Sequence, residues 1–166
     1  MLSAFGPIRA HRKPRIPAEN LARDRAFWSD LLAARAKSVD LPPHGGAGYG
    51  HRRFIIIRKA AWVTLYRAVS PYPQIGVFLR CSGLAGEAFF ALADSRRGAI
   101  APVLQSALEP EAKLHWGCSY HPGTIDVAAH IAAPLPWDDA AADAHVAWLL
   151  RIGAVWWASF VPLAEP

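Results

Sequence analysis

The feature that most constrains the fold is the order in which strand-like and helical patterns follow one another over residues 54–163. Three short runs rich in β-branched and aromatic residues come first, and their period-two alternation is typical of strands. A helical pattern follows, with a break expected near Arg97, then two more strand-like runs and an apolar, tryptophan-rich helix. The links between the first three runs are too short for parallel crossovers, so these strands are expected to be antiparallel. The strand-like runs are residues 54–58, 61–67, 74–81, 114–118 and 125–131, and the helical patterns are residues 84–108 and 146–163.

One more helix is predicted before the strands, from Ala18 to about Lys37, because its apolar residues recur at helical spacing. The glycines of residues 42–50 follow this helix and open a strand, which is the reverse of a phosphate-binding glycine loop. That segment is therefore predicted to be a flexible connector. The sequence as a whole predicts an α+β fold: a mostly antiparallel sheet of about five strands, in the order α-βββ-α-ββ-α, with helices packed mainly on one face.

Length and composition predict one domain with a short basic extension. The 166 residues are 53% apolar, which is enough for a substantial core. The formal net charge of +5 comes mainly from residues 1–17, because the fourteen basic residues beyond them nearly balance the thirteen acids. We predict a basic flexible tail over residues 1–17 and a single α+β domain over residues 18–166. The tail's basic residues are Arg9, Arg12, Lys13 and Arg15.

The first three strand-like runs carry a one-sided charge. Between Asp40 and Glu87 the sequence has six basic residues and no acid, which favours an anionic partner, although such residues also simply solvate an exposed sheet face. If Val63 and Leu65 point to the helices, then Trp62, Thr64, Tyr66, Phe78 and Arg80 share the opposite face. The alternative is that the C-terminal helix or a dimer partner covers that face. The predicted binding surface consists of Arg52, Arg53, Arg58, Trp62, Tyr66, Phe78 and Arg80.

A second candidate site lies in the last predicted hairpin. Strand parity places His115, Asp126 and His130 on one face, where a histidine oriented by a carboxylate can act as a general base. Paired histidines with a carboxylate can also hold a metal. The spacing is not that of a strong ligand set, so neither a metal nor a cofactor is predicted. The alternative is that these are polar residues on a solvated strand face.

Cysteine content and the N-terminal residues suggest a cytoplasmic protein. Cys81 and Cys118 make no disulfide framework, which favours a reducing compartment. Pro7, Arg9 and His11 interrupt any apolar stretch of a signal peptide. The apolar last helix contains charged and helix-breaking residues within the length that a membrane span needs, so no membrane contact is predicted.

Several local patterns resemble the bacterial family known as domain of unknown function 4268. The resemblance covers most of residues 26–163 and implies an α+β fold and a prokaryotic origin. Members of that family often lie beside nuclease-like domains, which implies an association with DNA processing or defence. The resemblance supplies no catalytic residues, and this chain has less acidic and polar helices than the family. The matching patterns are Phe27-Trp28, the run Trp62-Val63-Thr64-Leu65-Tyr66, Phe90-x-Leu92, Leu114-x-Trp116 and Trp148 on the last helix.

No catalytic motif is recognisable in the sequence, and two functional hypotheses follow. The first is a non-catalytic interaction module, homodimeric, that binds a protein partner or nucleic acid through the predicted binding surface. The second is a small hydrolase or metal-dependent enzyme that uses His115, Asp126 and His130. Whether the chain is an enzyme is left open, with the non-catalytic function preferred.

Overall fold

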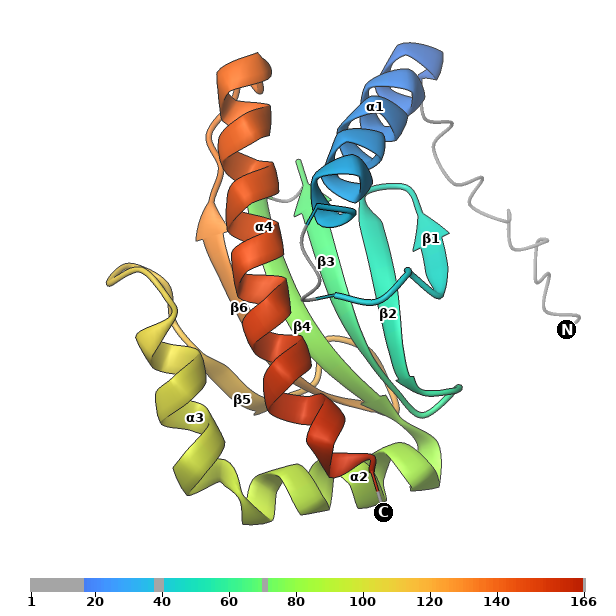
Figure 1. The fold of residues 1–166 in the computed structure, drawn as a ribbon, viewed down its shortest axis with the longest axis vertical. Coiled ribbons are helices and arrows are strands. Elements are labelled where there is room, and N and C mark those ends of the chain that lie inside the picture. Colours follow the sequence, from blue (N-terminus) through green and yellow to red (C-terminus); the bar gives the residue numbers. More distant parts are fainter. Residues whose placement is uncertain (1–16, 38–40, 70–71, 166) are drawn as a thin grey trace, which may run out of the picture.

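The structure, a computed structural model, describes residues 17–37, 41–69 and 72–165. Within them the chain forms a six-stranded antiparallel sheet and four α-helices, as the predicted α+β class requires (Figure 1). The predicted tail lies outside the described residues except for Pro17. The elements are α1 (Ala18–Arg35), β1 (Gly46–Gly48), β2 (His51–Ile57), β3 (Ala61–Ala68), β4 (Gln74–Ser82), α2 (Gly83–Ser95), α3 (Arg97–Ser106), β5 (His115–Cys118), β6 (Thr124–Ala132), α4 (Asp139–Phe160) and a final 3₁₀ turn (Val161–Leu163).

The strands lie in the order β1-β2-β3-β4-β6-β5, and every neighbouring pair is antiparallel. Strands β2, β3 and β4 form the predicted meander, and β5 pairs with β6 as the predicted hairpin. The strand count differs from the expectation because the predicted connector contains β1, whose Gly46 lies opposite Arg53. Glycines carry no side chain and so give no alternation, which is why sequence patterns miss this edge strand.

All four helices pack toward one face or one end of the sheet, and none of the described helices lies behind it (Figure 1). Helix α4 crosses the central strands, and α1 lies beside it over β2 and β3. Helices α2 and α3 follow the end of the sheet and are separated at Arg96, so the predicted break is confirmed. The prediction that helices cover mainly one face is confirmed as well.

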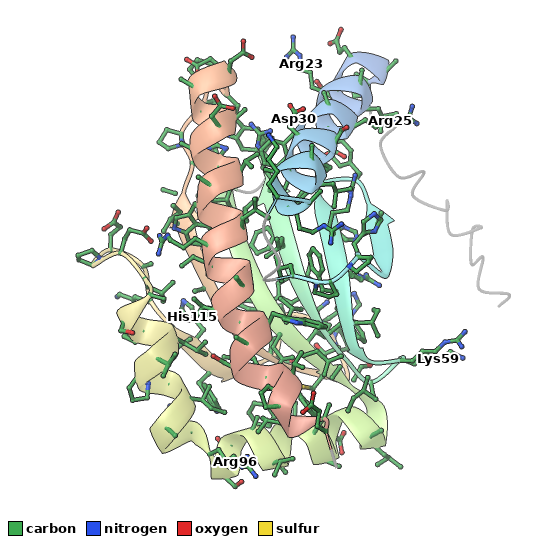
Figure 2. All side chains as sticks on the ribbon, viewed as in Figure 1. Arg23, Arg25, Asp30, Lys59, Arg96 and His115 are labelled. Carbon is green, nitrogen blue, oxygen red and sulfur yellow. The ribbon has the colours of Figure 1, made fainter. Side chains whose placement is uncertain are left out.

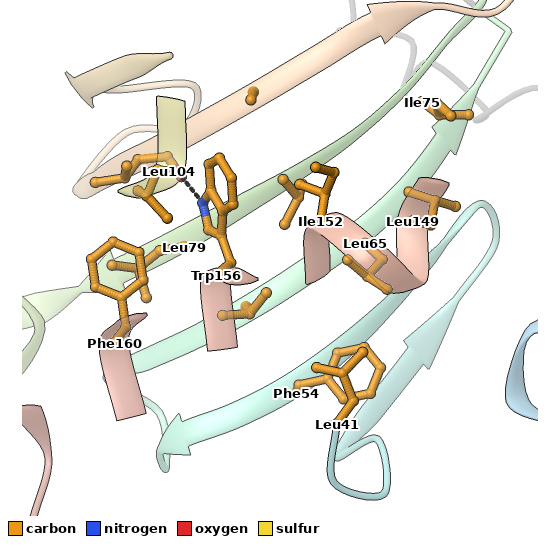
Figure 3. Close-up of a cluster of buried hydrophobic side chains, with 14 of the residues drawn as sticks. Leu41, Phe54, Leu65, Ile75, Leu79, Leu104, Leu149, Ile152, Trp156 and Phe160 are labelled. Carbon is orange, nitrogen blue, oxygen red and sulfur yellow. Dashed lines mark hydrogen bonds between the residues drawn. The ribbon is translucent and has the colours of Figure 1, made fainter. Parts of the chain in front are cut away.

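The core is the layer between α4 and the sheet (Figure 3). Alternate residues of β3, among them Val63 and Leu65, are fully buried against the apolar side of α4. The indole of Trp156 is also fully buried, and its Nε1 donates to the backbone carbonyl of Val127 at 3.1 Å. Each large apolar side chain buried in this way contributes about 1.5–3 kcal/mol of transfer free energy. The sheet's helix-facing side is therefore the main source of stability.

Helix α4 begins with an aspartate cap: the side chain of Asp138 accepts from the backbone N–H of Ala141 at 2.8 Å. By length and composition, the segment Asp139–Leu163 also meets the criterion for a membrane-crossing helix, and no other helix of the described residues does. A core helix meets the same criterion, and the stripe of α4 that includes Leu149 and Ile152 is fully buried on the sheet. Packing on the sheet accounts for the apolar residues of this buried stripe.

Candidate functional site

The side of the sheet that faces away from the helices is the candidate site, and we call it the uncovered face. Strand register brings one residue in two from each strand onto it. The C-terminal helix packs on the opposite side, so the alternative that α4 covers these residues is wrong. The uncovered face consists of His51, Arg53, Ile55, Trp62, Thr64, Tyr66, Gly76, Phe78, Arg80, His115, Asp126, Ala128 and His130.

At the β2–β3 end of this face lies a shallow hollow of about 590 Å³, which we call the cationic hollow. The guanidinium of Arg53 lies over the Trp62 ring, 5.4 Å from its centroid. Arg58 and Lys59 form the hairpin turn, and Figure 2 shows Lys59 projecting outward from its tip. All three basic side chains are exposed, and no carboxylate lines the hollow. The lining residues are Gly45, Arg53, Ile55, Arg58, Lys59 and Trp62.

Beside the hollow, Trp62, Tyr66 and Phe78 are half-buried and form what we call the ring cluster. Tyr66 and Phe78 are 5.8 Å apart between ring centroids. The outer end of the Tyr66 ring lies over Gly76, where an added Cβ would come within 2.5 Å of Cε1, Cζ and Oη. Gln74 Nε2 donates to the Tyr66 hydroxyl at 3.2 Å, and burial raises the pKa of that phenol. A glycine and a glutamine thus hold the tyrosine ring in place.

Arg80 and Asp126 form the ion pair at the centre of the uncovered face. The guanidinium donates from Nε and from an Nη to the two carboxylate oxygens, each at 2.9 Å. Asp126 is fully buried and also accepts from the backbone N–H of Tyr120 at 3.3 Å. Arg80 continues over the Phe78 ring, 4.6 Å from its centroid. The Asp126 carboxylate thus bonds to Arg80 and Tyr120, and among the described residues no hydrogen bond joins it to His115 or His130.

The predicted histidine pair does come together. The rings of His115 and His130 are stacked, 5.5 Å apart between centroids and 3° from parallel. Burial, and next the proximity of His115, lower the pKa of His130, so this ring is uncharged at neutral pH. Among the described residues, no group of three His, Cys, Asp or Glu side chains could hold a metal ion. The structure therefore places two of the three candidate catalytic side chains together and commits the third to Arg80.

Arg52 was predicted to belong to the binding surface, and the structure places it on the helix-facing side instead. Its strand partner is the buried Leu65, and its guanidinium lies over the Trp28 ring of α1, 4.9 Å from the centroid. The physical reason is the strand period: two consecutive residues, here Arg52 and Arg53, must point to opposite faces. The same alternation sends Arg67 to the helix side.

Two polar atoms of the uncovered face have no hydrogen-bond partner among the described residues. They are Trp62 Nε1 and Thr64 Oγ1, and both are buried. Thr64 is 2% exposed and lies opposite Arg53 on one neighbouring strand and Phe78 on the other. Leaving a buried polar group unpaired costs about 1–3 kcal/mol. Thr64 lies between Trp62 and Tyr66 on the same face of β3.

Sequence reasoning placed Trp62, Thr64, Tyr66, Phe78 and Arg80 on this face, as the strand register has them, and missed Gly76. Gly76 has no side chain and so adds nothing to the aromatic and basic pattern by which the face was recognised. Strand register could have pointed to Gly76, because alternation places it on the same face as Phe78. Its position beneath Tyr66 required the cross-strand pairing of Tyr66 with Gly76.

Comparisons with known protein families, with curated proteins and with solved structures give no match for this chain. The resemblance to the domain of unknown function 4268 stays a prediction.

Proposed function

We propose that this domain is a non-catalytic interaction module that binds an anionic partner through the uncovered face. The observation that carries the proposal is the one-sided packing of the helices, which leaves half-buried rings and exposed cations on the other side of the sheet. Aromatic residues and arginine are enriched at protein interfaces relative to the rest of the surface.

The charge of the face favours an anion over a second copy of the chain. Asp126 is the one carboxylate on the described strand positions of this face, and Arg80 neutralises it. Arg53, Arg58 and Lys59 have no ion-pair partner among the described residues. A two-fold dimer through this face would bury the same cationic patch twice, and like charges across an interface are costly. Homodimerisation stays a prediction for other surfaces.

The test is binding of two labelled anionic probes, a 15-nucleotide oligothymidylate and a 15-residue polyglutamate, measured by fluorescence anisotropy. The full chain is used with the tail's four basic residues replaced by serine, so that tail electrostatics are removed from the comparison. Substituting Trp62→Ala together with Tyr66→Ala should weaken binding of at least one probe about 10-fold or more, as expected for removal of two interface rings. Thermal unfolding should show that the double variant is folded.

A matched control removes the same two kinds of ring elsewhere. Trp157 is half-buried on α4 and Tyr72 is exposed in the β3–β4 loop, so Trp157→Ala with Tyr72→Ala should leave binding unchanged. The proposal fails if neither probe binds, or if both probes bind the Trp62/Tyr66 variant as tightly as the parent.

A further inference from the structure

The cationic hollow and the ring cluster are adjacent, and together they narrow the class of anionic partner. Resting on the function proposed above, we infer that the uncovered face binds single-stranded nucleic acid. Backbone phosphates occupy the cationic hollow, and unstacked bases lie on the ring cluster.

The hollow suits phosphate groups. The guanidinium groups of Arg53 and Arg58 can each donate two parallel hydrogen bonds to phosphate oxygens, and Lys59 adds a compact positive charge. Its volume of about 590 Å³ lies within the roughly 300–1,000 Å³ of small-molecule sites. It is an open hollow at the end of a hairpin, so a polymer chain can pass through it and continue along the face.

The ring cluster suits bases. Trp62 and Tyr66 lie four residues apart on one strand, a spacing of about 13 Å, and Phe78 on the next strand lies beside Tyr66. Stacking on aromatic rings and on guanidinium planes is how proteins bind single strands with little sequence preference. Arg53 over Trp62 and Arg80 over Phe78 supply such planes. An acidic peptide would use the cations but has no π-faces to match the rings, and a duplex hides its bases.

Lys59 gives a further sign that the turn is built for more than chain reversal. Its φ is +64°, in the left-handed region where glycine carries no strain. A turn selected for stability alone favours glycine or asparagine at such a position. Residues held in this region cluster at functional sites, although they also occur in ordinary hairpin turns.

The experiment compares four probes on the full chain with the tail's basic residues replaced by serine: a 15-nucleotide oligothymidylate, an abasic oligomer of equal length, a 15-base-pair duplex and polyglutamate. The oligothymidylate should bind at least about 5-fold more tightly than the abasic oligomer, since each stacked base contributes a factor of this size or more. Trp62→Ala and Tyr66→Ala should each reduce that preference. Gly76→Ala should reduce it too, because a Cβ there displaces the retained Tyr66 ring.

The phosphate contacts are tested separately by salt dependence. Replacing Arg53, Arg58 and Lys59 with alanine should lower the slope of log K against log salt concentration by roughly 2, as three lost contacts to a single strand predict. The matched control removes three exposed arginines from the helix side, Arg23, Arg25 and Arg96, which Figure 2 shows on α1 and near the α2–α3 junction. This control should leave the slope nearly unchanged.

The single substitution Lys59→Gly tests the phosphate contact even if the variants with several substitutions unfold. It should weaken oligothymidylate binding about 2-fold or more at low salt while the melting temperature stays the same or rises. The inference is overturned if polyglutamate or the abasic oligomer binds as tightly as the oligothymidylate, or if the helix-side control lowers the salt slope equally. If polyglutamate alone binds, and loses affinity in the Trp62/Tyr66 variant, the interaction module stands and single-stranded nucleic acid is ruled out as its partner.

Discussion

Arginine–aromatic contacts occur on both faces of the sheet, but in different surroundings. On the helix-covered face, the guanidinium of Arg67 lies between Phe27 and Trp137, 4.0 and 3.9 Å from the two ring centroids. On the uncovered face, Arg53 lies 5.4 Å from one ring centroid only, that of Trp62, and is exposed. Both contacts are cation–π pairs, but only the first is enclosed by the protein's own side chains.

The difference shows that coverage, and not residue type, decides what an arginine–aromatic contact does. Burial lowers the pKa of Arg67 to about 10, which reflects a charge held in a desolvated setting between α1 and α4. Such a contact stabilises the fold and is closed to partners. Arg53 keeps its hydration and its free donors, so the same pairing with a ring remains open to a ligand.

The largest expected contrast in unfolding free energy is between two tryptophans. Trp156 on the helix-covered side is fully buried, and Trp62 on the uncovered face is half-buried. Trp156→Ala should lower the free energy of unfolding by about 3–5 kcal/mol, since it leaves a cavity beneath α4 and removes the bond to Val127. Trp62→Ala should cost about 1 kcal/mol, because its ring is already partly in water. Urea unfolding at pH 7 measures both. Equal losses would mean that the uncovered face is core, and the distinction between the faces would fail.

A smaller contrast is expected between the two arginines. Arg67→Ala should cost about 1–3 kcal/mol, since two desolvated cation–π contacts are lost together. Arg53→Ala should change the free energy of unfolding by no more than about 0.5 kcal/mol, as is usual for an exposed side chain. Chemical denaturation of both variants gives the comparison, and a larger loss at Arg53 would contradict it.

The smallest effect concerns pH. Burial, and next the charge of Arg67, lower the pKa of His145 below its ordinary value of 6.5. The unfolded chain then binds more protons than the folded one, so stability is fully present above pH 6.5 and falls as the pH drops toward the folded-state pKa. His145→Asn should reduce this fall, whereas His121→Asn, at an exposed loop position, should not. Denaturation at several pH values between 5 and 8 tests this, and an unchanged pH dependence in the His145 variant would refute it.

Sequence reasoning predicted the structure correctly where the polarity or backbone preference of a residue indicates its environment. Val63 and Leu65 could be assigned to the core because apolar residues in alternation have only one favourable side to face. The separation of α2 from α3 near Arg97 followed from a glycine and a proline within a helical pattern. The histidine pair followed from strand parity, and its stacking is what adjacent strands produce.

Other features depended on partners that are distant in the sequence. Asp126 was grouped with histidines because they share a hairpin, but Arg80, 46 residues away, lies directly opposite it and takes the carboxylate. The edge strand of Gly46–Gly48 exists because the backbone of β2 is there to pair with it. Neither cross-strand neighbour is encoded in local spacing, so neither feature was open to sequence reasoning.

By itself, then, the sequence determined which residues seek burial and which alternate with them, because hydrophobic patterning is a local property that survives in any correct fold. Only the tertiary structure decided which arginine–aromatic contacts the helices enclose and which remain exposed. That choice depends on how α4 and α1 dock together on one apolar surface, a balance of packing among segments more than a hundred residues apart.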